Sequence, residues 1–242
     1  MTTARRQLTP PKQQSPKHKF GKNKMERTKF TLPNHRPLIK ICGLTQPDNA
    51  LDCVHAGADA IGLVFFDKSP RNIGMEKARA ITRVLPHHIL TCGVFVNESF
   101  DFIMERVENC HLTAVQLHGQ EPPELVEKLA KENLMVIKAL FAVKKPDLAD
   151  ALFYTAASFC LVEYGKGILP GGNAETWDYG VSAQLNTRVP LMLAGGLSCE
   201  NIRQAICLAN PSAVDVSSGV EKTHGFKDIK RVTAFIRMAR PA

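Results

Sequence analysis

Two side chains that can carry a proton lie where apolar runs of the sequence end. Cys42 closes the run at residues 38–43 (LIKICG), and Glu163 lies near the end of the run at residues 158–164 (SFCLVEY). A carboxyl group among apolar neighbours keeps its proton and can act as a general acid, whereas a thiol near cationic groups or backbone dipoles can ionise and act as a base. The alternative for Cys42 is a small buried core residue. A carboxylate that ends an apolar strand must be paired or exposed.

Small residues follow two later apolar runs. The segments LAGGLSCENI (193–202) and DVSSGVE (215–221) place glycines and serines where a strand gives way to a loop or a helix start. Backbone N–H groups can approach an anion closely at such points, although either motif alone is more often structural. Together they predict a phosphate site whose residues are Gly195, Gly196, Ser217, Ser218 and Gly219.

A basic loop follows the run at residues 60–66. Its sequence FFDKSPRNI offers Lys68 and Arg71. A loop arginine is usually solvated, but its forked donors can instead hold a carboxylate through two hydrogen bonds. Metal chemistry is not indicated, because His87 and His88 adjoin each other and lack the spacing of helical metal ligands.

The elements that would position these residues recur along the chain. Amphipathic stretches about a helix long separate eight apolar runs, as expected of repeated βα units. The alternative, a doubly wound open sheet, usually carries a GxGxxG turn after its first strand, and that turn is absent. We therefore expect one closed (β/α)8 barrel, with strands at residues 38–43, 60–66, 90–97, 114–119, 135–140, 158–164, 190–196 and 213–219.

In such a barrel the carboxyl ends of the strands form the active-site face. The residues expected there are Cys42, Gly43, Phe66, Asp67, Asn97, His118, Gly119, Lys138, Glu163, Gly195, Gly196, Ser217, Ser218 and Gly219.

The positive charge of the chain is concentrated at its start. The net charge is +8, and residues 1–24 hold seven basic residues and no acid. This segment is rich in Pro, Gln and Lys, so we expect residues 1–36 to form a disordered basic extension and residues 37–242 to form the barrel. A nucleic-acid-binding tail is the alternative to an inert extension. Residues 1–24 contain only one aromatic residue, Phe20, on which a base could stack, and this argues against nucleic-acid binding.

The remaining composition indicates a cytoplasmic globular protein. The chain has 242 residues, of which 44% are hydrophobic, and it has no apolar stretch long enough to cross a membrane and no secretory signal. Its seven cysteines are scattered without a CxxC pair, so we expect reduced thiols rather than disulfides or a zinc site.

The motifs together resemble one enzyme family. KICGLT, GADAIGLVFFDKSPRNI, GVFVN, AVQLHGQE, PGGNAETWDY, LAGGLSCENIRQAI and AVDVSSGVE are similar to segments of phosphoribosylanthranilate isomerase, in the family's order, over about residues 38–238. The resemblance implies a (β/α)8 barrel and an aldose–ketose (Amadori) isomerisation. N-(5-phosphoribosyl)anthranilate would become 1-(o-carboxyphenylamino)-1-deoxyribulose 5-phosphate without a cofactor or a metal.

The resemblance also implies roles for individual residues. Cys42 corresponds to the general base and Arg71 to the arginine that binds the substrate carboxylate. The phosphate would lie on the backbone around Gly195, Gly196, Ser217, Ser218 and Gly219, with Asp215 supporting the end of its strand and His118 lining the active-site opening.

One position departs from the family pattern. The family's general acid is an aspartate, and this chain has Glu163 there. Direct substitution with a backbone adjustment, reduced activity, and a related sugar isomerisation are the three interpretations, and we favour the first. The loop with Gly171 and Gly172 also lacks a third glycine that the family usually has.

Rival functions remain open at the level of the sequence. They are another phosphosugar barrel, such as indole-glycerol-phosphate synthase or a histidine-pathway isomerase, and an inactive barrel with a nucleic-acid-binding tail. The first two enzymes would have a lysine or an aspartate where Cys42 stands. The sequence leaves a monomer and a homodimer equally open.

Overall fold

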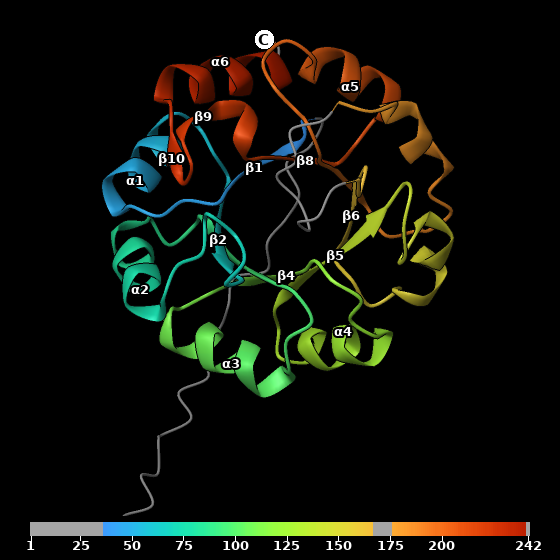
Figure 1. The fold of residues 1–242 in the computed structure, drawn as a ribbon, viewed down its shortest axis with the longest axis horizontal. Coiled ribbons are helices and arrows are strands. Elements are labelled where there is room, and N and C mark those ends of the chain that lie inside the picture. Colours follow the sequence, from blue (N-terminus) through green and yellow to red (C-terminus); the bar gives the residue numbers. More distant parts are fainter. Residues whose placement is uncertain (1–35, 167–175, 241–242) are drawn as a thin grey trace, which may run out of the picture.

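Eight parallel strands close into a barrel in chain order, with β8 hydrogen-bonded back to β1 (Figure 1). The computed structural model describes residues 36–166 and 176–240. The closed barrel confirms the architecture predicted from the sequence, and each strand begins within one residue of its predicted start. The strands are β1 (Leu38–Cys42), β2 (Ala60–Phe65), β3 (Leu90–Phe95), β4 (Ala114–Leu117), β5 (Met135–Phe141), β6 (Phe159–Glu163), β7 (Leu191–Leu193) and β8 (Ala213–Val216).

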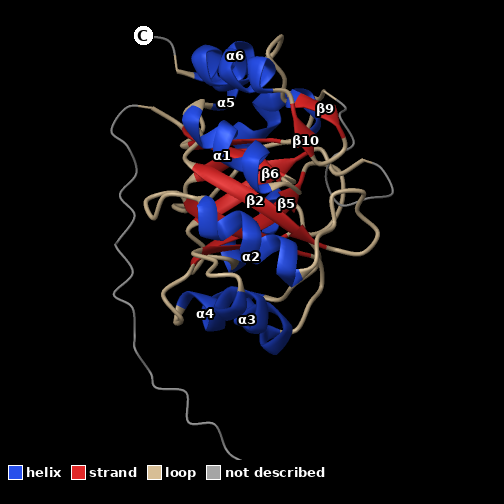
Figure 2. Ribbon diagram, turned by 90° about the vertical axis from the view of Figure 1, so that its left-hand side faces the viewer, coloured by secondary structure: helices blue, strands red, loops and turns tan. Residues whose placement is uncertain are grey.

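Helices pack around the outside of the strands (Figure 2). Local sequence explains where several of them begin: Pro47 opens α1, and the side chains of Ser99 and Asp228 accept hydrogen bonds from backbone N–H groups in the first turns of α3 and α6. The helices are α1 (Pro47–His55), α2 (Met75–Val84), α3 (Phe100–Asn109), α4 (Pro123–Ala130), α5 (Ile202–Ala209) and α6 (Ile229–Ala239).

Two of the expected helices are short 3-10 helices instead. Within the described residues, the connections after β5 and β6 therefore depart from the expected α-helix of a βα unit. They carry η1 (Leu148–Phe153) and η2 (Tyr179–Gln184), each of six residues. After β8 the chain adds η3 (Ser218–Val220) and a two-stranded sheet of β9 (Glu221–Thr223) and β10 (Phe226–Lys227).

The alternation of side chains along each strand divides the core in two. One apolar cluster fills the barrel interior and includes Leu38, Ile137 and Phe159, whereas the larger cluster lies between strands and helices. Towards the carboxyl ends of the strands the buried residues become polar, as at Lys40 and Gln116, which are 0% and 2% exposed. The barrel interior is thus apolar at the amino ends of the strands and contains a layer of buried polar groups below the active-site opening.

Some sequence predictions fall outside the described residues. Nearly all of the basic extension lies there, as do Gly171 and Gly172. Within residues 36–166 and 176–240, no helix is long and apolar enough to cross a membrane. No group of three or more metal-ligating side chains occurs in the same ranges.

Candidate active site

Cys42 ends β1 at the opening of the barrel, where the carboxyl ends of the strands meet. Its side chain is 7% exposed, and burial raises the pKa of its thiol, while the charges of Lys40 and Lys227 oppose that rise. The hydroxyl of Ser217 donates to the carbonyl of Cys42 over 3.0 Å, which joins the ends of β8 and β1. The thiol therefore lies in a fixed, nearly dry position beside cations.

Glu163 ends β6 and is 5% exposed. Its Oε1 lies 3.3 Å from Nε2 of His118, whose Nδ1 is 2.9 Å from the amide nitrogen of Gln116. With the Gln116 amide nitrogen in this orientation, Nδ1 accepts, which places the ring proton on Nε2 next to Glu163. His118 thus contacts the proposed acid directly, rather than only lining the opening. Sequence reasoning missed Gln116, although its position two residues before His118 places it on the same face of β4.

The glycines after β7 turn the backbone sharply. Gly195 and Gly196 have φ angles of 84° and 64°, which favour glycine. Side chains hold three successive carbonyls of this turn: Ala194 accepts from Trp177, Gly195 accepts from Tyr179, and Gly196 accepts from Asn201. The sequence analysis did not single out these three donor side chains, although WDY (177–179) appeared within a family motif.

The loops after β7 and β8 are in contact at the predicted phosphate residues. A Cβ atom on Gly219 would collide with the carbonyl oxygen of Leu197, so only glycine allows this approach. Ser217 precedes η3, and the first residues of η3 are Ser218 and Gly219. The structure thus brings the two small-residue motifs together at the start of a helical turn, a geometry suited to an anion.

Arg71 is buried, contrary to the usual solvated loop arginine, and it is 6% exposed. Its Nε and Nη2 donate to the two carboxylate oxygens of Glu221 over 2.8 and 2.6 Å. Its Nη1 makes no hydrogen bond within the described part of the chain. Lys227 also contacts Glu221, with 2.8 Å between Nζ and Oε1. Two cations share one carboxylate, so the cluster has a net charge of +1 next to Cys42.

The Arg71–Glu221–Lys227 cluster has strong electrostatic coupling. Burial alone would raise the pKa of Glu221, but the hydrogen bonds and charges of Arg71 and Lys227 outweigh it and lower that pKa to about 2. Sequence reasoning missed Glu221 and Lys227. The only available signal was that the DVSSGVE motif ends at Glu221, six residues before Lys227.

Lys138 does not lie at the active-site opening, so its expected position at a strand end is wrong. It is in the middle of β5, because that strand continues to Phe141. Its Nζ pairs with Glu121 over 2.9 Å and donates to the carbonyl of Gly119 over 2.8 Å. Burial lowers the pKa of Lys138, and Glu121 offsets part of that effect. The pair supports the loop that follows His118.

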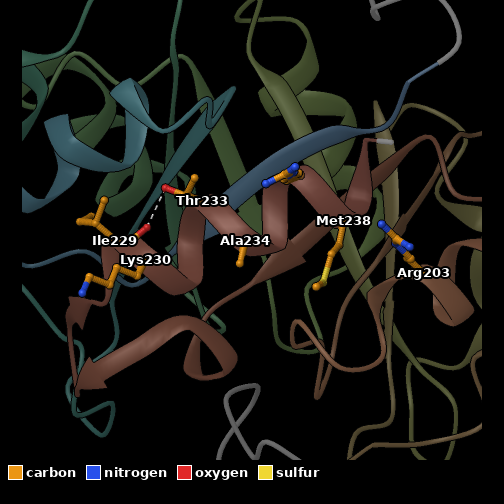
Figure 3. Close-up of a pocket in the computed structure, with 7 residues that line it drawn as sticks. Arg203, Ile229, Lys230, Thr233, Ala234 and Met238 are labelled. Atoms are coloured by element: carbon orange, nitrogen blue, oxygen red, sulfur yellow. Dashed lines mark hydrogen bonds between the residues drawn. The ribbon is translucent and has the colours of Figure 1, made fainter. Parts of the chain in front are cut away.

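A cavity of about 630 Å³ lies away from these residues, between α5 and α6 (Figure 3). It contains none of the predicted site residues and is lined by Arg203, Ile229, Lys230, Thr233, Ala234, Arg237 and Met238.

The closed barrel, with a thiol and a carboxyl at one opening and an anion-type turn after β7 and β8, defines the chain as a (β/α)8-barrel enzyme of the phosphosugar class. Comparison with known families makes this specific. Residues 39–238 match the sequence model of N-(5'-phosphoribosyl)anthranilate (PRA) isomerase. The protein of that name from Desulfatibacillum aliphaticivorans is 48% identical over 201 residues, which cover 83% of this chain and 92% of the relative.

Solved structures agree with the sequence match. The crystal structure of phosphoribosyl anthranilate isomerase from Thermotoga maritima is 41% identical, with a TM-score of 0.77, and the match covers 84% of this chain and 98% of that one. A phosphoribosyl anthranilate isomerase in complex with reduced 1-(o-carboxyphenylamino)-1-deoxyribulose 5-phosphate is 39% identical, with a TM-score of 0.73 and the same coverage. The chain belongs to the N-(5'-phosphoribosyl)anthranilate isomerase family and is an isomerase of tryptophan biosynthesis.

Proposed function

We propose that the chain converts N-(5-phosphoribosyl)anthranilate to 1-(o-carboxyphenylamino)-1-deoxyribulose 5-phosphate by general acid–base catalysis, with Glu163 as the acid and Cys42 as the base. One observation carries the assignment of these roles. Both residues end strands of the same closed barrel, and both are buried at its opening, Cys42 beside cations and Glu163 beside His118.

Glu163 opens the sugar ring. Its carboxyl proton passes to the furanose oxygen, the bond from C1′ to that oxygen breaks, and the nitrogen lone pair forms a C1′=N double bond. Because His118 donates to Oε1, the other oxygen of Glu163 is the one that carries the proton. His118 therefore orients the acid without competing for its proton.

Cys42 then acts as a base. Its thiolate takes the C2′ proton, and the electrons of that bond form a C1′=C2′ double bond as the iminium returns to an amine. Loss of the 2′-hydroxyl proton and gain of a proton at C1′ complete the ketone. The substrate and product have the same atoms and the same total oxidation level, so the balance requires no external oxidant or reductant.

Two cationic or dipolar sites would hold the ends of the substrate. Arg71 keeps Nη1 outside its pairing with Glu221, interacts electrostatically with Cys42 and belongs to a cluster with a net charge of +1, which suits the anthranilate carboxylate. The turns at Gly195, Gly196 and Ser217 to Gly219 suit the phosphate. Asp215 contributes indirectly, because its carboxylate pairs with Lys40 at 2.9 Å below the opening.

The substitution of glutamate for the family's aspartate requires space for one extra methylene. Gly195 packs against the base of this side chain, because a Cβ there would lie 3.1 Å from the Cβ of Glu163, an atom that aspartate also has. The contact with His118 then fixes the carboxyl. We therefore propose that Glu163 replaces the aspartate directly.

The decisive test is a fluorescence assay of phosphoribosylanthranilate consumption. Cys42→Ser and Glu163→Gln should each lose nearly all kcat, whereas Glu163→Asp should retain or improve it. Cys160→Ser is the matched control, because Cys160 is equally buried but belongs to the outer apolar cluster. Full activity in both Cys42→Ser and Glu163→Gln would exclude the mechanism.

Three further expectations stay proposals. A Thermotoga maritima relative is described as dimeric, and light scattering will distinguish a homodimer from a monomer for this chain. Cytoplasmic location and an inert basic extension are the other two. Salt-dependent binding of DNA or RNA that disappears when residues 1–24 are deleted would contradict the inert extension.

A further inference from the structure

Lys40 is a fully buried lysine inside the barrel, directly below Cys42 on the same strand face. Residues two apart on a strand point the same way, so Lys40 and Cys42 both face the interior. Lys40 is 0% exposed, and its ammonium lies 2.9 Å from Oδ1 of Asp215, its register partner on β8. Burying a charged lysine costs free energy, and pairing with the carboxylate of Asp215 offsets that cost. The pairing does not explain why the lysine lies directly below the proposed base.

Gly62 on β2 shows how close the ammonium and the thiol are. Gly62 is the register partner of Cys42. A Cβ atom on Gly62 would lie 2.6 Å from Sγ of Cys42 and 3.0 Å from Nζ of Lys40. The two polar atoms therefore share the space that a side chain on β2 would occupy, and only glycine leaves that space free.

We propose that Lys40 is a positioning residue of the isomerisation, which stabilises the thiolate of Cys42 while Asp215 holds Lys40 charged and in place. This inference rests on the role of Cys42 as the base under the proposed function. The effect of Lys40 on the charge state of the thiol can be tested separately, because it does not depend on whether the thiol takes the substrate proton.

The electrostatics of the interior support this arrangement. Burial raises the pKa of Cys42, and the charge of Lys40 is the largest effect that lowers it. Asp215 also raises that pKa, and Lys227 lowers it. Arg71 is a further cation that interacts with the thiol. An opposite charge at such range typically changes a pKa by about 1 to 3.

Lys40 keeps its own charge despite its burial. Burial alone would lower the pKa of Lys40, but Asp215, Cys42 and Cys92 raise it above its ordinary value. Lys227 is the other cation near the thiol, but its ammonium is engaged by Glu221 and by both oxygens of Ser217. Lys40 is therefore the cation best placed to stabilise the negative charge of the Cys42 thiolate.

The test is the pH dependence of Cys42 alkylation by iodoacetamide in the full chain, measured by mass spectrometry of the peptide that contains Cys42. Lys40→Met alone leaves Asp215 as an unpaired buried charge and is at risk of not folding. The main variant is therefore Lys40→Met combined with Asp215→Leu, which removes both charges. Lys138→Met combined with Glu121→Gln is the matched control, because it removes another buried lysine–carboxylate pair with a 2.9 Å contact.

In the main variant the midpoint of alkylation should rise by up to about one pH unit, because Lys40 lowers the pKa of Cys42 more strongly than Asp215 raises it, and the rate at pH 7 should fall by up to about tenfold. The control pair should leave the midpoint unchanged. The kcat of the main variant should fall in parallel, and Lys40→Arg should restore most of the thiolate. An unchanged midpoint in the folded main variant would overturn the proposal. A raised midpoint with unchanged kcat would overturn the base role of Cys42 and leave the coupling of Lys40 to Cys42 standing.

Discussion

The carboxylate of Glu221 connects the stability of the barrel to the site around Arg71, and replacing it by glutamine tests that connection. Glu221 is 9% exposed and neutralises part of the charge of two buried cations, Arg71 and Lys227. A glutamine has nearly the same shape but no charge. Its single acceptor oxygen cannot serve Arg71 and Lys227 as two carboxylate oxygens do.

The magnitude follows from the pKa of Glu221. That pKa falls from 4.5 to about 2 on folding, and each pKa unit corresponds to about 1.4 kcal/mol, so the charged carboxylate stabilises the fold by about 3 kcal/mol at neutral pH. Because the pKa is lower in the folded state, this stabilisation is complete above about pH 4.5. It is lost as the pH falls towards 2.

Urea unfolding at a series of pH values measures the effect. We expect Glu221→Gln to be less stable by about 3 kcal/mol at pH 7, and we expect the difference from the unsubstituted protein to shrink as the pH falls from 4.5 towards 2. Glu105→Gln is the control, because the Glu105 side chain is 55% exposed. A difference that stays constant across this pH range, or one no larger than that of the control, would refute the reasoning.

Three further substitutions probe the rest of the site. Gly219→Ala should raise KM about tenfold or more and weaken inhibition by inorganic phosphate, because its Cβ collides with the β7 loop; unchanged steady-state kinetics would contradict this. Arg71→Lys should raise KM about tenfold with a smaller effect on kcat, because lysine lacks the fork that both contacts Glu221 and presents Nη1; a change confined to kcat would contradict it. Gln116→Met should lower kcat about tenfold and give His118 a mixture of tautomers in its ¹⁵N spectrum; a single unchanged tautomer would contradict it.

The sequence determined the scaffold and proposed the residues of the site. Apolar runs with amphipathic stretches between them predicted eight strands in a closed barrel, and this topology brings all carboxyl ends of the strands to one face. That reasoning, without any contact information, placed Cys42 and Glu163 at the same opening and the small residues at 195–196 and 217–219 beside each other. It failed at Lys138, which lies in the middle of β5 and not at its end.

The tertiary structure alone decided which partners surround these groups. Arg71 and Glu221 are 150 positions apart, and Lys40 and Asp215 are 175 apart, so no local pattern pairs them. Closure of the barrel brings β8 against β1, which pairs Lys40 with Asp215, and the chain that follows β8 brings Glu221 to Arg71. The physical reason is that burial and charge act through space. The sequence located the groups that can carry a proton, and only the closed barrel set the charges and hydrogen bonds that control those protons.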